Sequence, residues 1–187
     1  MTNSVSAGSR GVLYVVACAA PPALHVRVLL DQAAERGWEV CLIATPTAAV
    51  WLADQAAGLA AATGHPVRSA YKQPGEPDVL PPPDAIVVAP ATSNTINKWA
   101  AGISDNLALG LITEAIGKRL PIAVLPCVNE AQAAHPAFAR SIRELQDAGV
   151  SVVSGATDTA AGADETAEHG FRWHLALDAL DLLGQLG

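Results

Sequence analysis

The stretch Ala89-Pro90-Ala91-Thr92-Ser93-Asn94-Thr95 lies at the junction of two different structural patterns. Before it, residues 84–89 (DAIVVA) form a mostly apolar run that predicts a buried strand ending at Pro90, and after it a helical pattern begins at Ile96. Backbone N–H groups at a helix N-terminus favour an anion, and Thr92, Ser93 and Thr95 add hydroxyl donors. The stretch therefore predicts a phosphate-binding loop; alternatively, Ser93 or Asn94 serves only as the N-cap of the helix.

The same succession of strand, loop and helix recurs along the chain. Residues 12–17 (VLYVVA) form a continuous apolar run typical of a central parallel strand, and further strands are predicted at 40–44, 122–125 and 150–153, with a short one at 67–70. Helices are predicted at 21–36, 45–63, 106–118, 136–148 and 171–186, in addition to the one that begins at residue 96. Strands that alternate with helices predict right-handed crossovers in a parallel sheet. The expected fold class is α/β, a single three-layer Rossmann-like domain with a mostly parallel sheet.

The length of 187 residues predicts one domain. Residues 1–11 (MTNSVSAGSRG) are small and polar, lack the apolar segment of a secretory signal and predict a flexible N-terminal tail. The domain then covers residues 12–187. Within it, residues 154–170 are small, acidic and glycine-containing, which predicts a mobile loop.

Composition argues against several classes of function. The net charge is −7 without a basic block, so nothing favours binding to nucleic acid. No run of about 18 apolar residues is present to cross a membrane. Cys18, Cys41 and Cys127 are odd in number and widely spaced, and they match neither a disulfide framework nor a zinc pattern. No histidine–carboxylate spacing indicates another metal, and we expect a cytoplasmic protein in a reducing compartment.

The wider stretch 90–107 (PATSNTINKWAAGISDNL) resembles a family motif. It is similar to the PASANT motif and the downstream Lys-x-Ala-x-Gly-x-x-Asp-Asn-Leu of the homo-oligomeric flavin-containing cysteine decarboxylases, which include phosphopantothenoylcysteine decarboxylases and the peptidyl-cysteine decarboxylases of lantibiotic biosynthesis. The matching residues are Pro90, Ala91, Asn94, Thr95, Lys98, Ala100, Gly102, Asp105, Asn106 and Leu107. A weaker resemblance extends from about residue 12 to residue 153.

The resemblance implies a flavin cofactor, FMN with FAD as the alternative. It also implies flavin sites between the subunits of a homo-oligomer, commonly a trimer, with Asn94, Lys98, Asp105 and Asn106 in or near that contact. A chain that half encloses its cofactor needs a neighbour, so we expect a homo-oligomer.

Three loops are implied to bind the cofactor. Ala17-Cys18-Ala19 stands where relatives usually have Gly-Ser-Ile against the flavin phosphate; alanine cannot take glycine's positive φ cheaply, and cysteine is a weaker donor than serine. Cys18 is alternatively a small buried hydrophobe. Thr45 lies in a Thr-Pro-x-Ala sequence similar to the family's, where it would bond the phosphate or ribityl chain, or cap a helix, or both. The implied cofactor set is Ala17, Cys18, Ala19, Thr45, Pro90, Ala91, Thr92, Ser93, Asn94 and Thr95.

The family's catalytic histidine has no counterpart at the matching position. It lies about eight residues before the aspartate that opens the strand, and counting back from Asp84 gives Glu76. Glu76 would substitute as a base if burial raised its pKa; alternatively, it is a solvated loop carboxylate. The nearest histidine in the sequence is His65, and His25 or His135 could reach the site from elsewhere.

The segment that starts at Pro126 resembles the family's Pro-x-Met-Asn segment, which helps to hold the substrate. Asn129 is therefore a candidate, with Asn94, to position a substrate carboxylate or amide; alternatively, it is a loop-turn amide. Val128, Gln132 and Ala133 replace bulky family residues and imply a differently shaped pocket. Cys127 is either a reactive thiol, which requires a depressed pKa, or passive packing.

The resemblance implies oxidative decarboxylation of a cysteine residue or conjugate to an enethiol, with a small-molecule or peptide substrate that carries a cysteine carboxylate. No cysteine follows Cys127, so the clamp cysteine that reduces the enethiol in phosphopantothenoylcysteine decarboxylases is missing. The alternative is a flavin-binding protein that has lost this chemistry and serves a regulatory or different flavin-dependent role. A flavin prenyltransferase shares the fold, but its typical substrate-site residues are not evident.

Overall fold

A five-stranded sheet forms the centre of the computed structural model, which describes residues 10–153 and 170–184. Every pairing is parallel, in the order β2-β1-β3-β4-β5, which confirms the predicted α/β class. The strands are β1 (Val12–Ala17), β2 (Glu39–Ala44), β3 (Ala85–Ala91), β4 (Ile122–Pro126) and β5 (Ser151–Val152). The helices are η1 (Pro21–His25), α1 (Arg27–Glu35), α2 (Pro46–Trp51), η2 (Ala53–Gln55), α3 (Ala56–Thr63), α4 (Ser93–Ala100), α5 (Leu107–Gly117), α6 (Glu130–Ala134), α7 (Pro136–Asp147) and α8 (His174–Gly184).

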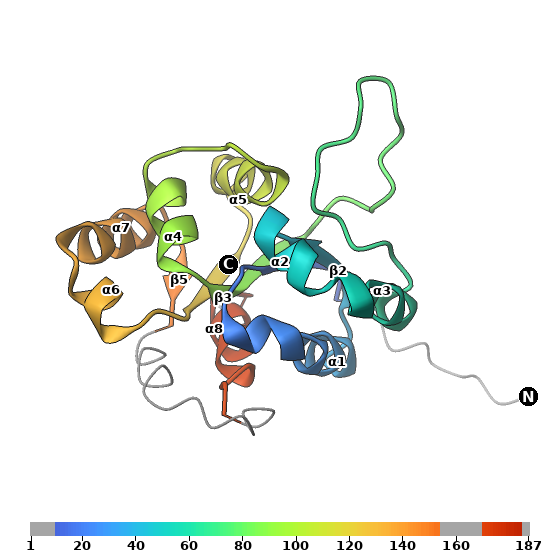
Figure 1. Ribbon diagram of the computed structural model, residues 1–187, viewed down its shortest axis with the longest axis horizontal. Coiled ribbons are helices and arrows are strands. Elements are labelled where there is room, and N and C mark those ends of the chain that lie inside the picture. Colours follow the sequence, from blue (N-terminus) through green and yellow to red (C-terminus); the bar gives the residue numbers. More distant parts are fainter. Residues whose placement is uncertain (1–9, 154–169, 185–187) are drawn as a thin grey trace, which may run out of the picture.

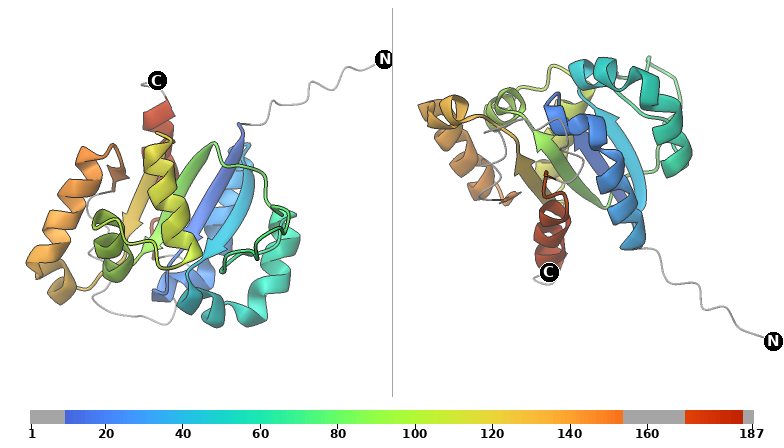
Figure 2. Two further views of the ribbon diagram at one scale, coloured as in Figure 1. Left: turned by 90° about the horizontal axis from the view of Figure 1, so that it is seen from above. Right: turned by 60° about the horizontal axis from the view of Figure 1, so that its bottom comes forward.

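Helices cover both faces of the sheet and produce three layers (Figures 1 and 2). Alternate residues of β1 point to opposite faces, as the pleat of a strand requires. Leu13 and Val15 join the core that α1, α3 and α8 cover, whereas Tyr14 and Val16 join the core beneath α4, α5 and α7. Both faces are therefore buried, which explains why β1 is apolar at every position.

Several element boundaries differ from the predictions because tertiary contacts set them. The predicted helix 45–63 is divided into α2, η2 and α3, with a break at the buried Leu52. The predicted strand at 67–70 is reduced to a single bridge between Arg68 and Ile43. Helix α6 was not predicted, and the last helix begins at His174, after the edge-to-face contact of Phe171 with Trp173.

The ends of the predicted domain carry their own contacts. Arg10, assigned to the flexible tail, donates its N–H to the Gly37 carbonyl at 3.0 Å, and its guanidinium lies over the Trp38 ring and pairs with Asp181 of α8. The remainder of the tail and the loop predicted at 154–170 lie outside the described residues, except Arg10, Gly11 and Gly170. Within residues 10–153 and 170–184, no helix is both long and apolar enough to span a membrane.

Candidate functional site

The carboxyl ends of the parallel strands meet at one edge of the sheet, which is where ligands bind in open α/β folds. Backbone hydrogen bonds join the loops that leave this edge: Thr45 N–H to Ala17 O at 3.0 Å, Cys18 N–H to Pro90 O at 3.0 Å, and Cys127 N–H to Ala91 O at 2.8 Å. The structure therefore brings together the three loops assigned to the cofactor, and places the Asn129 segment beside them.

Helix α4 begins earlier than the sequence indicated, because Thr92 caps it. The Thr92 hydroxyl accepts the Thr95 N–H at 3.4 Å and donates to the Thr95 hydroxyl at 3.1 Å. The alternative that Ser93 or Asn94 caps the helix is wrong, as was the predicted start at Ile96, and β3 continues past Pro90 to Ala91. Ser93 and Asn94 therefore occupy the first turn, where backbone N–H groups have no partner within the helix.

The loop after β1 takes its shape without glycine. Among the described residues, Arg119 is the only non-glycine residue with a positive φ, so Ala17, Cys18 and Ala19 are unstrained. Cys18 is fully buried, and burial raises the pKa of its thiol, although hydrogen bonds from Thr95 and Thr92 act in the opposite direction. The neutral Cys18 thiol packs beneath the loop, in agreement with the reading of a small buried hydrophobe.

Thr45 stands at the N-cap position of α2, but its hydroxyl makes no capping bond. The residue is 8% exposed, so the hydroxyl is held at the edge of the sheet. The Thr45 Oγ1 is not among the buried polar atoms that lack a partner in the described chain, so the hydroxyl itself reaches the surface. This arrangement leaves Thr45 available to a ligand, and removes helix capping by its side chain as the reason for its presence.

Asn129 and Cys127 follow β4 at the same edge. The Asn129 side chain accepts the Gln132 N–H at 2.8 Å and caps α6, so its Oδ1 has a structural task, and its Nδ2 hydrogens are left for another acceptor. Burial raises the pKa of the Cys127 thiol. A reactive thiol requires the opposite shift, so Cys127 packs as a neutral side chain.

Glu76 lies in the long connection between α3 and β3, which stands out from the body of the domain (Figure 1). It is exposed, and its carboxylate accepts the Gln73 N–H at 2.8 Å. Tyr14 and Tyr71 hold this connection by donating to the carbonyls of Pro81 and Asn106. Within the described chain, Glu76 is therefore an exposed loop carboxylate with a local backbone partner.

The histidines differ in their distance from the site. His65 bonds Glu39 at 2.8 Å, at the beginning of β2. Because a strand rises about 3.3 Å per residue, this is about 16 Å from the edge where β2 ends at Ala44. His135 lies between α6 and α7, in the region that follows β4, and it caps α7 by accepting the Ala137 N–H. His25, at the end of η1, also belongs to a loop of the candidate edge.

The motif downstream of α4 shapes the turn into α5. Lys98 pairs with Asp105, and this contact lowers the pKa of the Asp105 carboxyl. Asn106 accepts the Leu109 N–H at 3.1 Å and caps α5, while its amide donates to Asp105 at 3.0 Å. These residues therefore have local structural tasks in the single chain.

Asn97 is a polar residue beside the site that the sequence analysis missed. Its Nδ2 donates to the Ser93 hydroxyl at 3.3 Å, one helical turn away. The signal was available, because residues four positions apart lie on the same helix face.

The fold and the candidate site define a class of protein: a Rossmann-like α/β domain in which a helix N-terminus and neutral, hydroxyl-bearing loops meet at the carboxyl ends of the strands. The chain belongs to the Flavoprotein family, whose model matches residues 7–173. The predicted resemblance to flavin-containing cysteine decarboxylases is thereby confirmed.

Curated relatives match over part of the chain. A cysteine/cysteine sulfinic acid decarboxylase from an unknown prokaryotic organism is 38% identical over 80 residues, or 42% of this chain and 21% of that protein. A phosphopantothenoylcysteine decarboxylase from Malus domestica is 33% identical over 81 residues, or 43% of this chain and 37% of that protein. The aligned part thus spans well under half the length of these relatives.

Solved structures match over a larger share. The epidermin biosynthesis protein EpiD from Staphylococcus aureus has a TM-score of 0.62 and 26% identity, covering 76% of this chain and 81% of that one. The cypemycin decarboxylase CypD has a TM-score of 0.72 and 18% identity, covering 97% of this chain and 96% of that one. These likenesses establish the shared fold.

The residues at the edge fit a flavin nucleotide. The hydroxyl of Thr45 makes no capping bond, the turn at Ser93 presents N–H donors, and Ala17 and Ala19 are small enough for a close approach. None of the ten residues assigned to the cofactor is acidic, so no carboxylate of this set opposes a phosphate.

Proposed function

We propose that this chain binds FMN, with the phosphate against the first turn of α4 and the loops after β1 and β2. The observation that supports this most strongly is the convergence of these loops, through the hydrogen bonds from Thr45 to Ala17 and from Cys18 to Pro90. A helix N-terminus and hydroxyl donors at one point favour a phosphate. Ser93 and Thr45 would donate to it, and Thr92 would remain the cap of the helix.

We further propose a substrate with a cysteine carboxylate, which the enzyme would decarboxylate oxidatively. FMN supplies a two-electron acceptor when bound. The cysteine would lose CO₂ and two hydrogens and become an enethiol. Asn94, exposed on the first turn of α4, and the Nδ2 of Asn129 would hold the substrate carboxylate, because amide hydrogens are neutral donors that orient an anion without fixing it too tightly.

A second candidate is a flavin-binding protein without decarboxylase chemistry. It is favoured by the positions of the titratable groups. Glu76 is exposed on a projecting connection, and His65 is paired with Glu39 at the amino end of β2, away from the carboxyl ends of the strands. A base for the cysteine thiol would then have to come from His25, His135 or a second copy of the chain.

We propose a homo-oligomer, trimeric as in the resembled family, in which the neighbour encloses the exposed Asn94.

The deciding experiment mixes the purified protein with cysteine-terminated peptides or phosphopantothenoylcysteine without oxygen, and then admits air. Flavin absorbance and product mass are recorded together. Bleaching with a product lighter by CO₂ and two hydrogens would establish the decarboxylase. Bound flavin that never bleaches would favour the second candidate, and failure to take up FMN would overturn the cofactor proposal.

Asn94→Asp is the matched variant for this experiment. It keeps the shape of the side chain but places a negative charge beside the proposed phosphate and carboxylate, so flavin or substrate binding should weaken. Unchanged flavin occupancy together with an unchanged rate would remove Asn94 from the site.

A further inference from the structure

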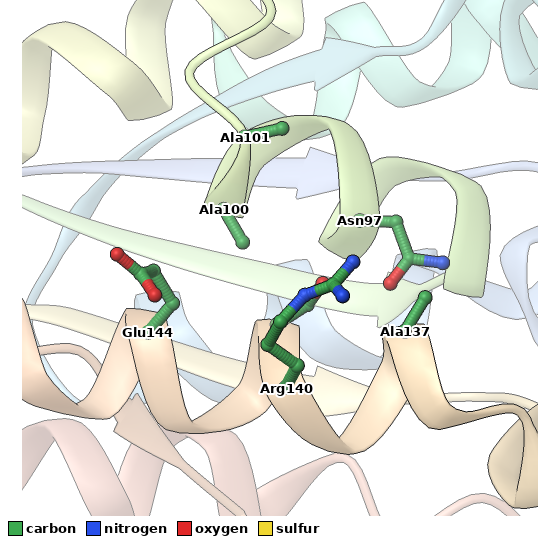
Figure 3. A pocket seen from close by; sticks show the side chains of 7 residues that line it. Asn97, Ala100, Ala101, Ala137, Arg140 and Glu144 are labelled. Carbon is green, nitrogen blue, oxygen red and sulfur yellow. The ribbon is translucent and has the colours of Figure 1, made fainter.

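Helices α4 and α7 pack side by side and leave a groove of about 110 Å³ between them (Figure 3). Its lining includes Asn97 on α4, with Arg140 and Glu144 on α7. Asn97 also reaches the candidate phosphate loop, because its Nδ2 donates to the Ser93 hydroxyl at 3.3 Å. One amide therefore connects the groove with the first residue of α4.

The direction of this hydrogen bond decides what Ser93 can offer a ligand. A serine hydroxyl has one proton and two acceptor lone pairs. When the Asn97 Nδ2–H occupies a lone pair, the Ser93 proton stays available to donate. A phosphate needs donors, so this orientation prepares Ser93 for an anion.

The groove favours this orientation of the amide. The Asn97 Oδ1 is buried and has no hydrogen-bond partner within residues 10–153 and 170–184. Figure 3 shows the Arg140 side chain extending across the groove toward Asn97, with Oδ1 on the side of α7. No described group lies within hydrogen-bond distance of Oδ1, but a guanidinium carries positive charge and only donors, so its field favours Oδ1 over the Nδ2 hydrogens on this side and leaves Nδ2 facing Ser93. In the reverse orientation, Oδ1 would accept a hydrogen bond from the Ser93 hydroxyl. The Nδ2 hydrogens would then face the donors of the Arg140 guanidinium.

We infer that Asn97 is a positioning residue that holds the Ser93 proton toward the phosphate of FMN, with Arg140 keeping the amide in the required orientation. This inference rests on the proposed function. Because it concerns only the phosphate, it predicts an effect on the affinity for FMN and none on the affinity for riboflavin, which has the same isoalloxazine and ribityl groups without the phosphate.

The test measures dissociation constants of FMN and riboflavin for the full chain and for Asn97→Ala, Ser93→Ala and the double variant. We expect Ser93→Ala to weaken FMN about tenfold, since a hydrogen bond to a charged group is lost, with riboflavin unchanged. Asn97→Ala should weaken FMN by a smaller factor, and the double variant should bind FMN like Ser93→Ala alone. Glu144→Gln lines the same groove without touching Ser93, and should change neither constant.

Asn97→Asp provides a second, independent variant. Its carboxylate can only accept hydrogen bonds, so it would accept one from the Ser93 hydroxyl and would add a negative charge near the phosphate. FMN should therefore bind to Asn97→Asp more weakly than to Asn97→Ala, and riboflavin binding should be less affected. Riboflavin binding also shows that each variant is folded.

Three outcomes would overturn the inference. Additive losses in the double variant would show that Asn97 does not act through Ser93. Equal losses for FMN and riboflavin would indicate a merely structural role. A wild-type chain that binds neither flavin would overturn the proposed function and the inference together, whereas tight FMN binding that Asn97→Ala leaves unchanged would overturn the inference alone.

Discussion

Replacing Thr45 with valine removes one hydroxyl and keeps the branched shape of the side chain. In the free protein this hydroxyl makes no capping bond and reaches the surface, so the free energy of unfolding should change little. With FMN bound, a hydrogen bond to the charged phosphate contributes about 1.5–3 kcal/mol, which corresponds to a loss of about 10- to 150-fold in affinity. A bond to the neutral ribityl chain contributes about 0.5–1.5 kcal/mol, or about 2- to 10-fold.

The assay is a titration of apoprotein with FMN and with riboflavin, followed by flavin fluorescence, together with urea unfolding of the apoprotein. A loss confined to FMN assigns Thr45 to the phosphate, and an equal loss for both ligands assigns it to the ribityl chain. Thr113→Val is the matched control, because the Thr113 hydroxyl on α5 is buried without a partner in the described chain. It should leave both affinities unchanged. If Thr45→Val binds both flavins as tightly as wild type, the reasoning about this edge of the sheet is refuted.

Three further substitutions test the connection between α3 and β3. Glu76→Gln should leave flavin affinity and any decarboxylation rate unchanged, because Glu76 is exposed and accepts only a local backbone N–H; abolished decarboxylation with intact flavin binding would instead establish Glu76 as the base. Burial raises the pKa of Tyr14 to about 12 from 10.0, so the folded state holds this proton more tightly, and the resulting stabilisation is complete below pH 10 and lost as the pH rises toward 12. Tyr14→Phe should therefore flatten the alkaline fall of the urea midpoint, while costing about 1 kcal/mol at neutral pH through the lost bond to Pro81; an equally steep fall in the variant would contradict this. A Cβ on Gly110 would lie 2.1 Å from the Tyr71 hydroxyl, so Gly110→Ala should displace that exposed ring and speed proteolysis within residues 64–84, with a free energy of unfolding that stays level or rises by up to about 1 kcal/mol; unchanged proteolysis would argue against Tyr71 as an anchor.

Much of the fold could be predicted from the sequence, because apolar runs record burial directly. Residues 12–17 form a strand with the predicted bounds, and the predicted parallel sheet is confirmed. The succession of strand, hydroxyl-rich loop and helix after residue 84 was also predicted, and a helix does follow that loop. The alternative N-cap at Ser93 or Asn94 is wrong because the N-cap residue is defined by its extended backbone, which Thr92 adopts and which residue types alone do not specify.

The sequence by itself determined the class of fold and the chemical character of the edge of the sheet, because hydrophobic periodicity and hydroxyl-rich loops are local properties. Only the tertiary structure decided which side chains are available there. It left the hydroxyl of Thr45 without a cap bond, placed Glu76 in solvent, paired His65 with Glu39 at the far edge and turned Asn97 toward Ser93. The physical reason is that burial and hydrogen-bond partners arise from segments distant in sequence or from exact backbone angles, and residue type and spacing record neither.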